Sequence, residues 1–245
     1  MKLALIGNGR MGRMIEALCA QSDEFEVEGF VGPGACSSPD EIADVDVMID
    51  FSYPGNLTMV LESALSRKIP LVIGTTGLTK EQGEEIRAAS AQIPIVWADN
   101  FSIGVTVLAR LAYMAKQALD GAGPGAYDVE IVEKHHNQKA DAPSGTAKML
   151  LREIDPDGYY ATVHGREGRP GPRGSEIGIH AVRGGSVAGE HSVFFFGQLE
   201  EIELRHRADS REIFARGALL AAQTVLRWQR SGLTGLYDME NVLFG

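Results

Sequence analysis

The stretch K-L-A-L-I-G-N-G-R-M-G, residues 2 to 12, decides the fold of the first half of this chain. Its apolar run predicts a short strand, and apolar residues between Met11 and Cys19 then recur at helical spacing. A strand, a G-x-G-x-x-G turn and a helix in this order are typical of a dinucleotide-binding domain, whereas the alternative is a glycine-rich turn without a ligand. We predict that the cofactor, NADH or NADPH, contacts Gly7, Asn8, Gly9, Arg10, Met11 and Gly12.

The second predicted strand, Phe25 to Val31, lies where such domains distinguish the two cofactors. An acidic residue near its end binds the ribose hydroxyls of NAD, and a basic residue favours NADP. Here the strand ends in Gly32-Pro33-Gly34, which supplies neither. The sequence therefore leaves the choice between NADH and NADPH open.

Strand and helix patterns continue to alternate, with further strands predicted at 45–51, 71–73 and 93–97. This alternation favours an α/β fold with a Rossmann-type, doubly wound parallel sheet. Ligands of such sheets bind beyond the carboxyl ends of the strands. The turns at 74–76 and 98–101 both lie at this end of the strands. Ordinary turn chemistry explains each of them equally well by itself, but the location that they share with the first glycine turn favours a ligand. Further cofactor contacts are therefore predicted at Gly74, Thr75, Thr76, Ala98, Asp99, Asn100 and Phe101.

The pattern changes after a long apolar helix predicted at 103–119. Strands are predicted at 128–133, 177–183, 186–196 and 201–207, which indicates a second, α+β domain with a mainly antiparallel or mixed sheet. A final helix at 209–227 is expected to return to the first domain. We therefore predict a dinucleotide-binding domain at 1–102 and 210–245, and a substrate-binding and oligomerisation domain at 103–209.

Titratable groups are concentrated in K-H-H-N-Q-K-A-D-A-P-S-G-T-A, residues 134 to 147. Asp141 and Ser144 are candidate helix caps, with Gly145 and Thr146 in the first turn. The start of a helix offers free N–H groups and partial positive charge, which suit an anion. Histidine suits proton transfer near neutral pH, and lysine binds a carboxylate or stabilises developing negative charge. The segment predicts an acid–base pair beside a carboxylate or phosphate site.

Charge and cysteine content exclude several other classes of protein. The formal net charge of −10 disfavours a nucleic-acid partner, which requires a basic face. Cys19 and Cys36 lack metal-ligand spacing, so neither a disulfide framework nor a metal site is predicted. No apolar run approaches the ~20 residues of a membrane span. We expect a cytoplasmic protein that has no membrane partner.

Residues 130 to 147 closely resemble the signature E-x-x-E-x-H-H-x-x-K-x-D-A-P-S-G-T-A of the dihydrodipicolinate reductases. These bacterial and plant enzymes, also called 4-hydroxy-tetrahydrodipicolinate reductases, act in lysine and diaminopimelate biosynthesis. The resemblance extends over nearly the whole chain. Its other pieces are G-R-M-G-R at 9–13, I-D-F-S-Y-P at 49–54, V-I-G-T-T-G at 72–77, A-D-N-F-S-I-G-V at 98–105, H-A-V-R-G-G at 180–185 and V-A-G-E-H at 187–191.

The resemblance implies reduction of a cyclic dicarboxylate, (2S,4S)-4-hydroxy-2,3,4,5-tetrahydrodipicolinate, by NADH or NADPH to (S)-2,3,4,5-tetrahydrodipicolinate and water. It implies that His135 is the acid–base catalyst and Lys139 a proton donor or charge stabiliser, with the division of roles left open. His136 is implied to contact the substrate, and Gly145 and Thr146 to hold a carboxylate. The family is typically a homotetramer assembled through the second domain's sheet. Gly32-Pro33 replaces the family's usual acidic residue and its neighbour.

Two other functions fit parts of the pattern. One is a different nicotinamide oxidoreductase, such as an amino-acid or semialdehyde dehydrogenase. The other is a dinucleotide sensor without catalysis, against which the His/His/Lys cluster argues because a sensor needs no proton donor. Five basic residues receive no catalytic role: Arg183 and His191 are expected in a hairpin, and His164, His180 and His206 at a surface or interface. Arg166, Arg169 and Arg173 either close over a dicarboxylate or keep a loop soluble, and solubility is favoured.

Overall fold

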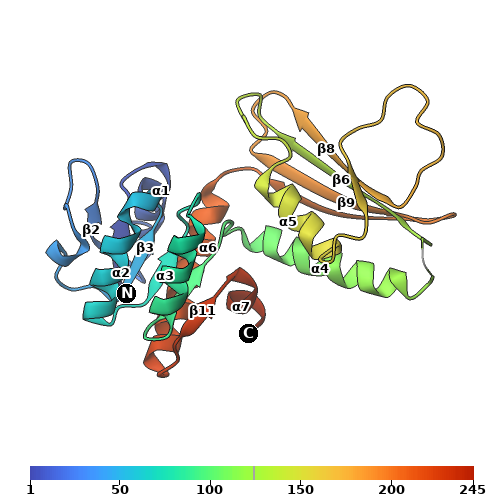
Figure 1. The fold of residues 1–245 in the computed structure, drawn as a ribbon. Coiled ribbons are helices and arrows are strands. Elements are labelled where there is room, and N and C mark those ends of the chain that lie inside the picture. Colours follow the sequence, from blue (N-terminus) through green and yellow to red (C-terminus); the bar gives the residue numbers. More distant parts are fainter. Residues whose placement is uncertain (124) are drawn as a thin grey trace. The chain divides into compact units, whose positions relative to one another are not determined.

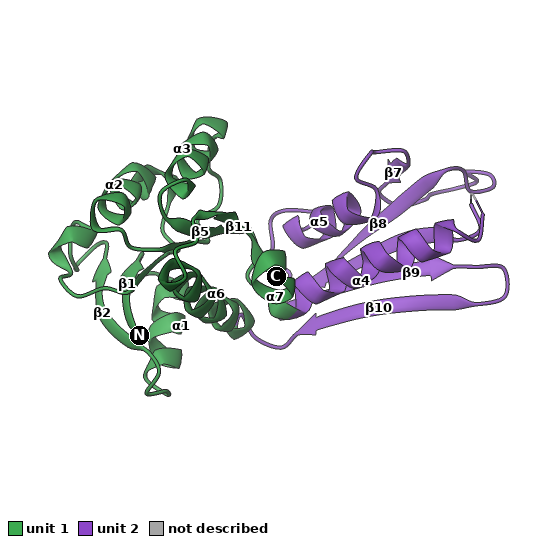
Figure 2. Ribbon diagram, turned by 90° about the horizontal axis from the view of Figure 1, so that it is seen from below, with its two compact units in different colours: residues 1–103, 212–245 green, residues 104–211 purple. Residues whose placement is uncertain are grey.

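The computed structural model describes residues 1–123 and 125–245. The chain forms two compact units, which Figure 2 colours separately. Unit 1 comprises Met1–Ile103 and Glu212–Gly245, and unit 2 comprises Gly104–Arg211. Among the described residues, no helix is both long and apolar enough to cross a membrane.

Unit 1 is built on a six-stranded sheet whose strand pairs are all parallel, which confirms the doubly wound fold. The strand order is β11-β5-β4-β3-β1-β2. β11 was not among the predicted strands, since its sequence G-L-Y is not a continuous apolar run, unlike the equally short L-V-I of β4. The strands are β1 (Lys2–Ile6), β2 (Glu26–Val31), β3 (Val47–Asp50), β4 (Leu71–Ile73), β5 (Pro94–Trp97) and β11 (Gly235–Tyr237).

Helices cover both faces of this sheet (Figure 1). Successive residues of β1 point to opposite faces, so Leu3 and Leu5 pack with α1 and α6 while Ala4 and Ile6 pack with α2. A strand buried on both faces reads as a continuous apolar run, as β1 does. Thr79 and Gln82 form the predicted capping box of α3. The helices are α1 (Arg10–Cys19), α2 (Leu57–Arg67), α3 (Lys80–Ser90), α6 (Glu212–Arg230) and α7 (Met239–Phe244), with 3-10 turns η1 (Pro39–Glu41) and η2 (Pro54–Asn56).

Unit 2 contains a five-stranded sheet in the order β10-β9-β6-β8-β7. β9 runs antiparallel to β10 and β6, whereas β8 runs parallel to β6 and β7, so the sheet is mixed, as predicted. The strands are β6 (Asp128–His135), β7 (Ala161–Val163), β8 (Glu176–Arg183), β9 (Gly189–Phe196) and β10 (Glu201–Ala208).

Two helices, α4 (Ile103–Asp120) and α5 (Gly145–Ile154), pack on one face of the second sheet (Figure 1). Val129 and Ile131 of β6 join this core. Because side chains alternate along a strand, Glu133 lies on the helix-covered face and Glu130 on the opposite one. The two glutamates of the E-x-x-E segment therefore belong to different environments.

Candidate active site

The glycines of the first turn fit a close approach of backbone to a dinucleotide. Gly7 has φ +98°, and a Cβ there would lie 2.5 Å from Phe51 O. A Cβ on Gly12 would lie 2.1 Å from Gly7 O, so only glycine lets α1 pack against the turn. Gly9 begins α1 without a side-chain cap, and the first turn holds no acidic residue. This helix start is suited to the pyrophosphate of a dinucleotide.

The other three residues of this turn have different environments. Asn8 Nδ2 donates a hydrogen bond to Pro33 O, which ties the turn to the segment after β2. Arg10 is exposed, whereas Met11 is partly buried against the core of unit 1. Asn8 and Met11 therefore shape the turn, and Arg10 extends into solvent.

The turns after β4 and β5 lie at the same sheet edge, but some of their side chains face inward. Thr75 is buried and its Oγ1 donates to Asp50 Oδ1 over 2.9 Å. Phe101 is 2% exposed and its ring packs edge-on against Phe51. The side chains of these two residues therefore face the protein interior. Gly74 also packs against the Phe51 ring, and Asn100 Oδ1 accepts the Ser102 N–H, while Thr76 and Asp99 are exposed and Ala98 is partly buried.

Asp50 is a buried carboxyl group that the sequence reasoning did not single out. It is fully buried, and its Oδ1 accepts hydrogen bonds from the Ser52 hydroxyl and the Thr75 hydroxyl. Burial raises the pKa of Asp50, against the opposing effect of these hydrogen bonds. The carboxyl group fixes the ends of β3 and β4 relative to each other. An acidic residue ending an apolar strand is the sequence signal that marks it.

In unit 2, the predicted catalytic residues follow one another around the end of β6. The His135 side chain is 11% exposed, and its Nδ1 lies 2.6 Å from Glu133 Oε2. Lys139 Nζ forms an ion pair with Asp141 over 2.8 Å. Burial lowers the pKa of His135, Glu133 opposes this effect, and the positive charge of Lys139 adds to it. His135 and Lys139 therefore act electrostatically on each other.

His136 lies just beyond β6, where its N–H donates to Val187 O over 2.8 Å. Its Nε2 lies 3.4 Å from Arg211 Nη2. Arg211 was not predicted at the site, because it lies 75 positions away and carries no local motif. The His136 imidazole and the Arg211 guanidinium group are therefore both available for hydrogen bonds beside this turn.

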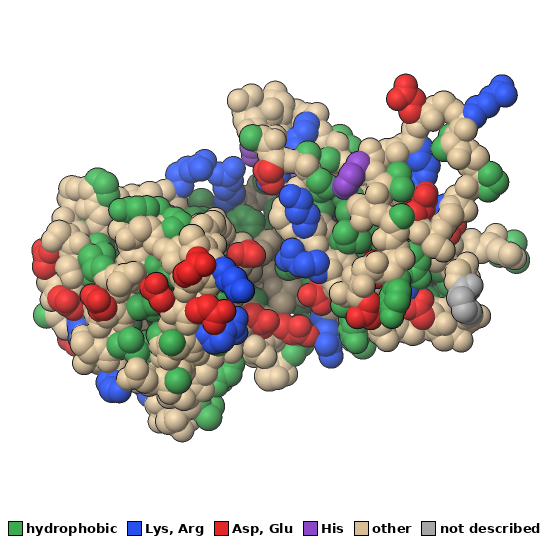
Figure 3. Space-filling model, viewed as in Figure 1, with side chains coloured by type: hydrophobic (Ala, Val, Ile, Leu, Met, Phe, Trp, Pro, Cys, Tyr) green, Lys and Arg blue, Asp and Glu red, His purple; other side chains and the backbone are tan. Residues whose placement is uncertain are grey.

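The helix start predicted after the histidines exists, and Ser144 caps it. Ser144 Oγ accepts from Ala147 N–H over 3.1 Å, while Asp141, the other candidate cap, pairs with Lys139 instead. The first turn of α5 contains Gly145 and Thr146 and no acidic residue. Lys and Arg side chains gather over the α5 side of unit 2 in Figure 3. The start of α5 therefore retains the electrostatic character of an anion site.

Glu133 is fully buried, and its two carboxylate oxygens accept four hydrogen bonds. Arg183 contacts both of its oxygens over 2.7 Å, and the Ser144 N–H donates to Oε1 over 3.0 Å. Burial alone would raise the pKa of Glu133, but hydrogen bonds from Arg183 and His135 hold it below its ordinary value. Arg183 does not lie in a hairpin as expected, because β6 lies between β8 and β9 in the sheet. Its guanidinium group instead neutralises the buried charge of Glu133.

His191 also differs from the hairpin residue expected. It is 3% exposed, and its Nε2 lies 3.0 Å from Ser144 Oγ. Burial lowers the pKa of His191 to about 3. The ring is therefore neutral at physiological pH and adds no positive charge beside His135.

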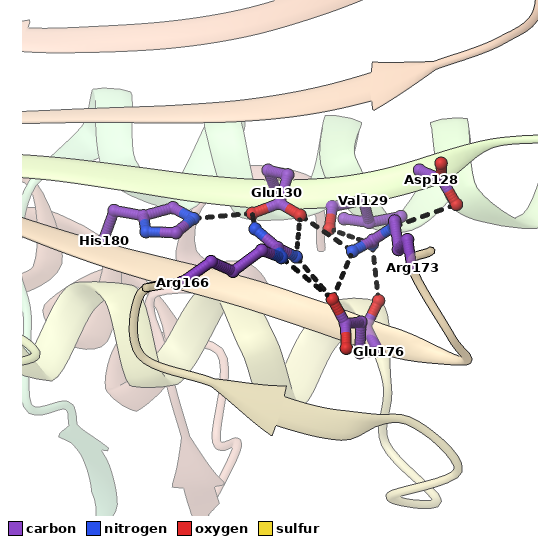
Figure 4. Close-up of polar contacts among 7 residues, drawn as sticks. All are labelled: Asp128, Val129, Glu130, Arg166, Arg173, Glu176 and His180. Atoms are coloured by element: carbon purple, nitrogen blue, oxygen red, sulfur yellow. Dashed lines mark hydrogen bonds and ion pairs between the residues drawn. The ribbon is translucent and has the colours of Figure 1, made fainter. Parts of the chain in front are cut away.

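A separate charged cluster occupies the opposite face of the same sheet (Figure 4). Arg166 and Arg173 both form ion pairs with Glu130 and Glu176, and His180 Nε2 lies 2.6 Å from Glu130 Oε2. The interpretation of these two arginines as merely solubilising is therefore wrong. Their ion pairs hold the segment after β7 against β6 and β8.

No three His, Cys, Asp or Glu side chains within 1–123 and 125–245 are arranged to hold a metal ion.

Comparisons with known proteins agree along the whole chain. The family model described as "Dihydrodipicolinate reductase, N-terminus" matches residues 1–101, and "Dihydrodipicolinate reductase, C-terminus" matches residues 104–243. A 4-hydroxy-tetrahydrodipicolinate reductase of Akkermansia muciniphila is 43% identical, with 96% of this chain and 94% of the relative covered. One from Caldanaerobacter subterraneus subsp. tengcongensis is 41% identical, with 96% and 95% covered.

Solved structures share the fold. A dipicolinate-bound dihydrodipicolinate reductase from Paenisporosarcina sp. TG-14 has a TM-score of 0.79 at 24% identity, with 99% of each chain covered. A diaminopimelate dehydrogenase of C. glutamicum has a TM-score of 0.57 at 11% identity, with 98% of this chain and 93% of the other covered. At these identities the likeness concerns the fold alone.

Proposed function

This chain belongs to the dihydrodipicolinate reductase family, and from that membership we propose how its residues perform the family's reaction. The activity is the NADH- or NADPH-dependent reduction of (2S,4S)-4-hydroxy-2,3,4,5-tetrahydrodipicolinate, which yields (S)-2,3,4,5-tetrahydrodipicolinate and water. This reaction belongs to lysine and diaminopimelate biosynthesis.

Unit 1 is the proposed dinucleotide-binding domain. The uncapped start of α1 and the clash that a Cβ on Gly7 or Gly12 would cause support this assignment. The segments after β4 and β5 complete the proposed cofactor contacts at Gly74–Thr76 and Ala98–Phe101. When bound, the nicotinamide cofactor supplies the hydride.

Unit 2 is the proposed substrate-binding domain. The observation that carries this proposal is the start of α5, a helix start capped by Ser144 that has no acidic residue in its first turn. We assign one substrate carboxylate to Gly145 and Thr146. His136 provides a further substrate contact beside them.

His135 and Lys139 are the proposed catalytic residues. Hydride addition to a conjugated carbon leaves negative charge, which a nearby acid must neutralise with a proton. The partly buried imidazole of His135 holds such a proton, and the Lys139 ammonium group stabilises the charge before it is neutralised. Both groups lie on the segment that ends at the proposed carboxylate site.

Turnover of the cyclic substrate tests the proposal directly. We expect oxidation of NADH or NADPH, followed by absorbance, only when the condensation product of pyruvate and aspartate semialdehyde is supplied. Running both cofactors in parallel also measures the preference that Gly32-Pro33 leaves open. Absence of turnover with both cofactors, or turnover of an amino acid or semialdehyde alone, would contradict the proposed function.

The open face of the second sheet is the proposed assembly surface of a homotetramer. Phe194 and Phe196 stack on it with ring centroids 5.5 Å apart, and Phe196 is 37% exposed. An apolar pair on an otherwise charged face favours cover by a second chain. Light scattering after size exclusion is expected to give a mass about four times that of the 26.4 kDa chain. A species of single-chain mass would contradict this.

We also propose a cytoplasmic location, where NADH and NADPH are available. Cys19 and Cys36 are both free thiols, as a reducing compartment favours. Recovery of the native protein mainly with membranes or in the periplasm would contradict this location.

A further inference from the structure

We propose that Glu133, fixed by Arg183, is a positioning residue that confines the exchangeable proton of His135 to its Nε2 atom. The inference rests on the proposed role of His135 and extends it to a residue outside the predicted site. Glu133 acts through His135 and does not itself contact the substrate.

The first step concerns the tautomer of His135. An ionised carboxylate only accepts hydrogen bonds, and Glu133 Oε2 lies 2.6 Å from His135 Nδ1. Nδ1 must therefore carry a hydrogen in both the neutral and the charged ring. The proton gained and lost on titration then resides on Nε2, which becomes the atom that delivers it.

The second step is that the carboxylate has a single orientation. Each Glu133 oxygen accepts two hydrogen bonds: Oε2 from Arg183 and His135, and Oε1 from Arg183 and the Ser144 N–H. Its side chain has no exposed surface. Arg183 also donates to Asp141 O over 2.7 Å. The same carboxylate thus fixes both the imidazole and the cap of α5, so the proton donor and the proposed carboxylate site share one support.

The third step is that the Nε2 edge of the ring is left uncovered by Gly189. A Cβ at Gly189 would lie 3.2 Å from His135 Nε2 and 3.5 Å from Cδ2. Glycine at this position of β9 leaves the space that a side chain would fill. On the same strand, the His191 ring packs edge-on against the His135 ring with centroids 5.1 Å apart, and it is Gly189 that leaves space at Nε2.

The charges around His135 determine the expected effect of removing Glu133. Lys139 and Arg183 are positive and lower the pKa of His135, Glu133 raises it, and His191 is neutral because burial depresses its own pKa. Asp141 is paired with both Lys139 and, through its backbone, Arg183. Replacement of Glu133 by a neutral residue removes the nearest negative charge, so the pKa of His135 falls further.

The kinetic test compares Glu133→Gln with Glu130→Gln. Glu130 is a matched control, because it lies on the same strand and, like Glu133, pairs with arginine and histidine side chains, but on the other face (Figure 4). We expect Glu133→Gln to lower kcat by about 10- to 100-fold, below the full contribution of an acid–base group since the imidazole remains. In this variant, the decrease of kcat with rising pH should begin at a lower pH than in the unsubstituted enzyme. KM should change less than kcat.

Glu130→Gln is expected to leave the pH dependence of kcat unchanged. An unshifted pH profile in Glu133→Gln, or wild-type kcat in that variant, would overturn the proposal. Turnover by the unsubstituted enzyme is measured in parallel, and its absence would instead contradict the proposed function.

A spectroscopic test of the tautomer needs no turnover. The ¹⁵N shifts of His135, assigned by comparison with His135→Gln, should show a protonated Nδ1 and an unprotonated Nε2 in the neutral ring of the unsubstituted protein. In Glu133→Gln, the Nε2-protonated tautomer should gain population. A neutral ring protonated on Nε2 in the unsubstituted protein would overturn the inference by itself.

Discussion

His135→Ala is expected to lower kcat by about 10²- to 10⁴-fold, the usual contribution of a general acid–base group. The substitution removes the imidazole that is proposed to hold the proton, while the proposed carboxylate site at the start of α5 is retained. The loss should therefore fall mainly on kcat, with a smaller change in KM. Steady-state oxidation of the preferred cofactor, measured at saturating substrate, gives both constants.

The matched control for this substitution is His164→Ala. His164 is an exposed histidine of unit 2 and lies outside the proposed site. Its removal is therefore expected to change kcat by less than about twofold. Full activity of His135→Ala would remove this residue from the mechanism and assign the proton to Lys139. A comparable loss in both variants would indicate damage to unit 2 as a whole.

Local sequence patterns were sufficient to predict most of unit 1. The strand, glycine turn and helix of residues 2–19 form one continuous signal, and alternation of apolar runs gave four further parallel strands. β11 was missed because its G-L-Y segment is not a continuous apolar run, and its place beside β5 depends on a long return of the chain. The prediction therefore failed for the strand whose position is determined by tertiary packing.

The sequence predicts those residues of the candidate site that lie close together in the chain. It does not predict those that strand pairing brings in from distant positions. His135, Lys139 and the start of α5 lie within a few residues of one another, so their grouping is visible in the sequence. Arg183 reaches Glu133 across 50 positions, because β6 pairs with β8 and sets His135 opposite Arg183. Likewise His191 lies opposite Glu133 on β9. Neither strand register is encoded in a local motif, so the sequence alone indicates only hairpin positions for both residues.

Arg183→Met is expected to reduce the free energy of unfolding by about 3–5 kcal/mol, the usual result of removing one partner of a buried ion pair. Glu133 has no exposed side-chain surface and would keep only His135 and the Ser144 N–H as partners. For a chain of this size the melting temperature should fall by roughly 6–20 °C. Calorimetry or circular dichroism measures the shift, and Arg216→Met is the control. Arg216 pairs with Glu212 at an exposed i,i+4 site, where such pairs contribute about 0.3–0.5 kcal/mol.

The pH dependence of this destabilisation distinguishes a buried charge from lost packing. In the unsubstituted protein the pKa of Glu133 is lowered, so its stabilising effect is present above its ordinary pKa and is lost as pH falls. Without Arg183, burial raises that pKa instead, and the variant becomes less stable as pH rises through it. The difference in melting temperature between the unsubstituted protein and Arg183→Met should therefore be largest near pH 7 and decrease toward pH 4. Adding Glu133→Gln to Arg183→Met should recover part of the loss at pH 7. A gap that is constant with pH and unaffected by the second substitution would mean that Arg183 stabilises unit 2 through its packing alone.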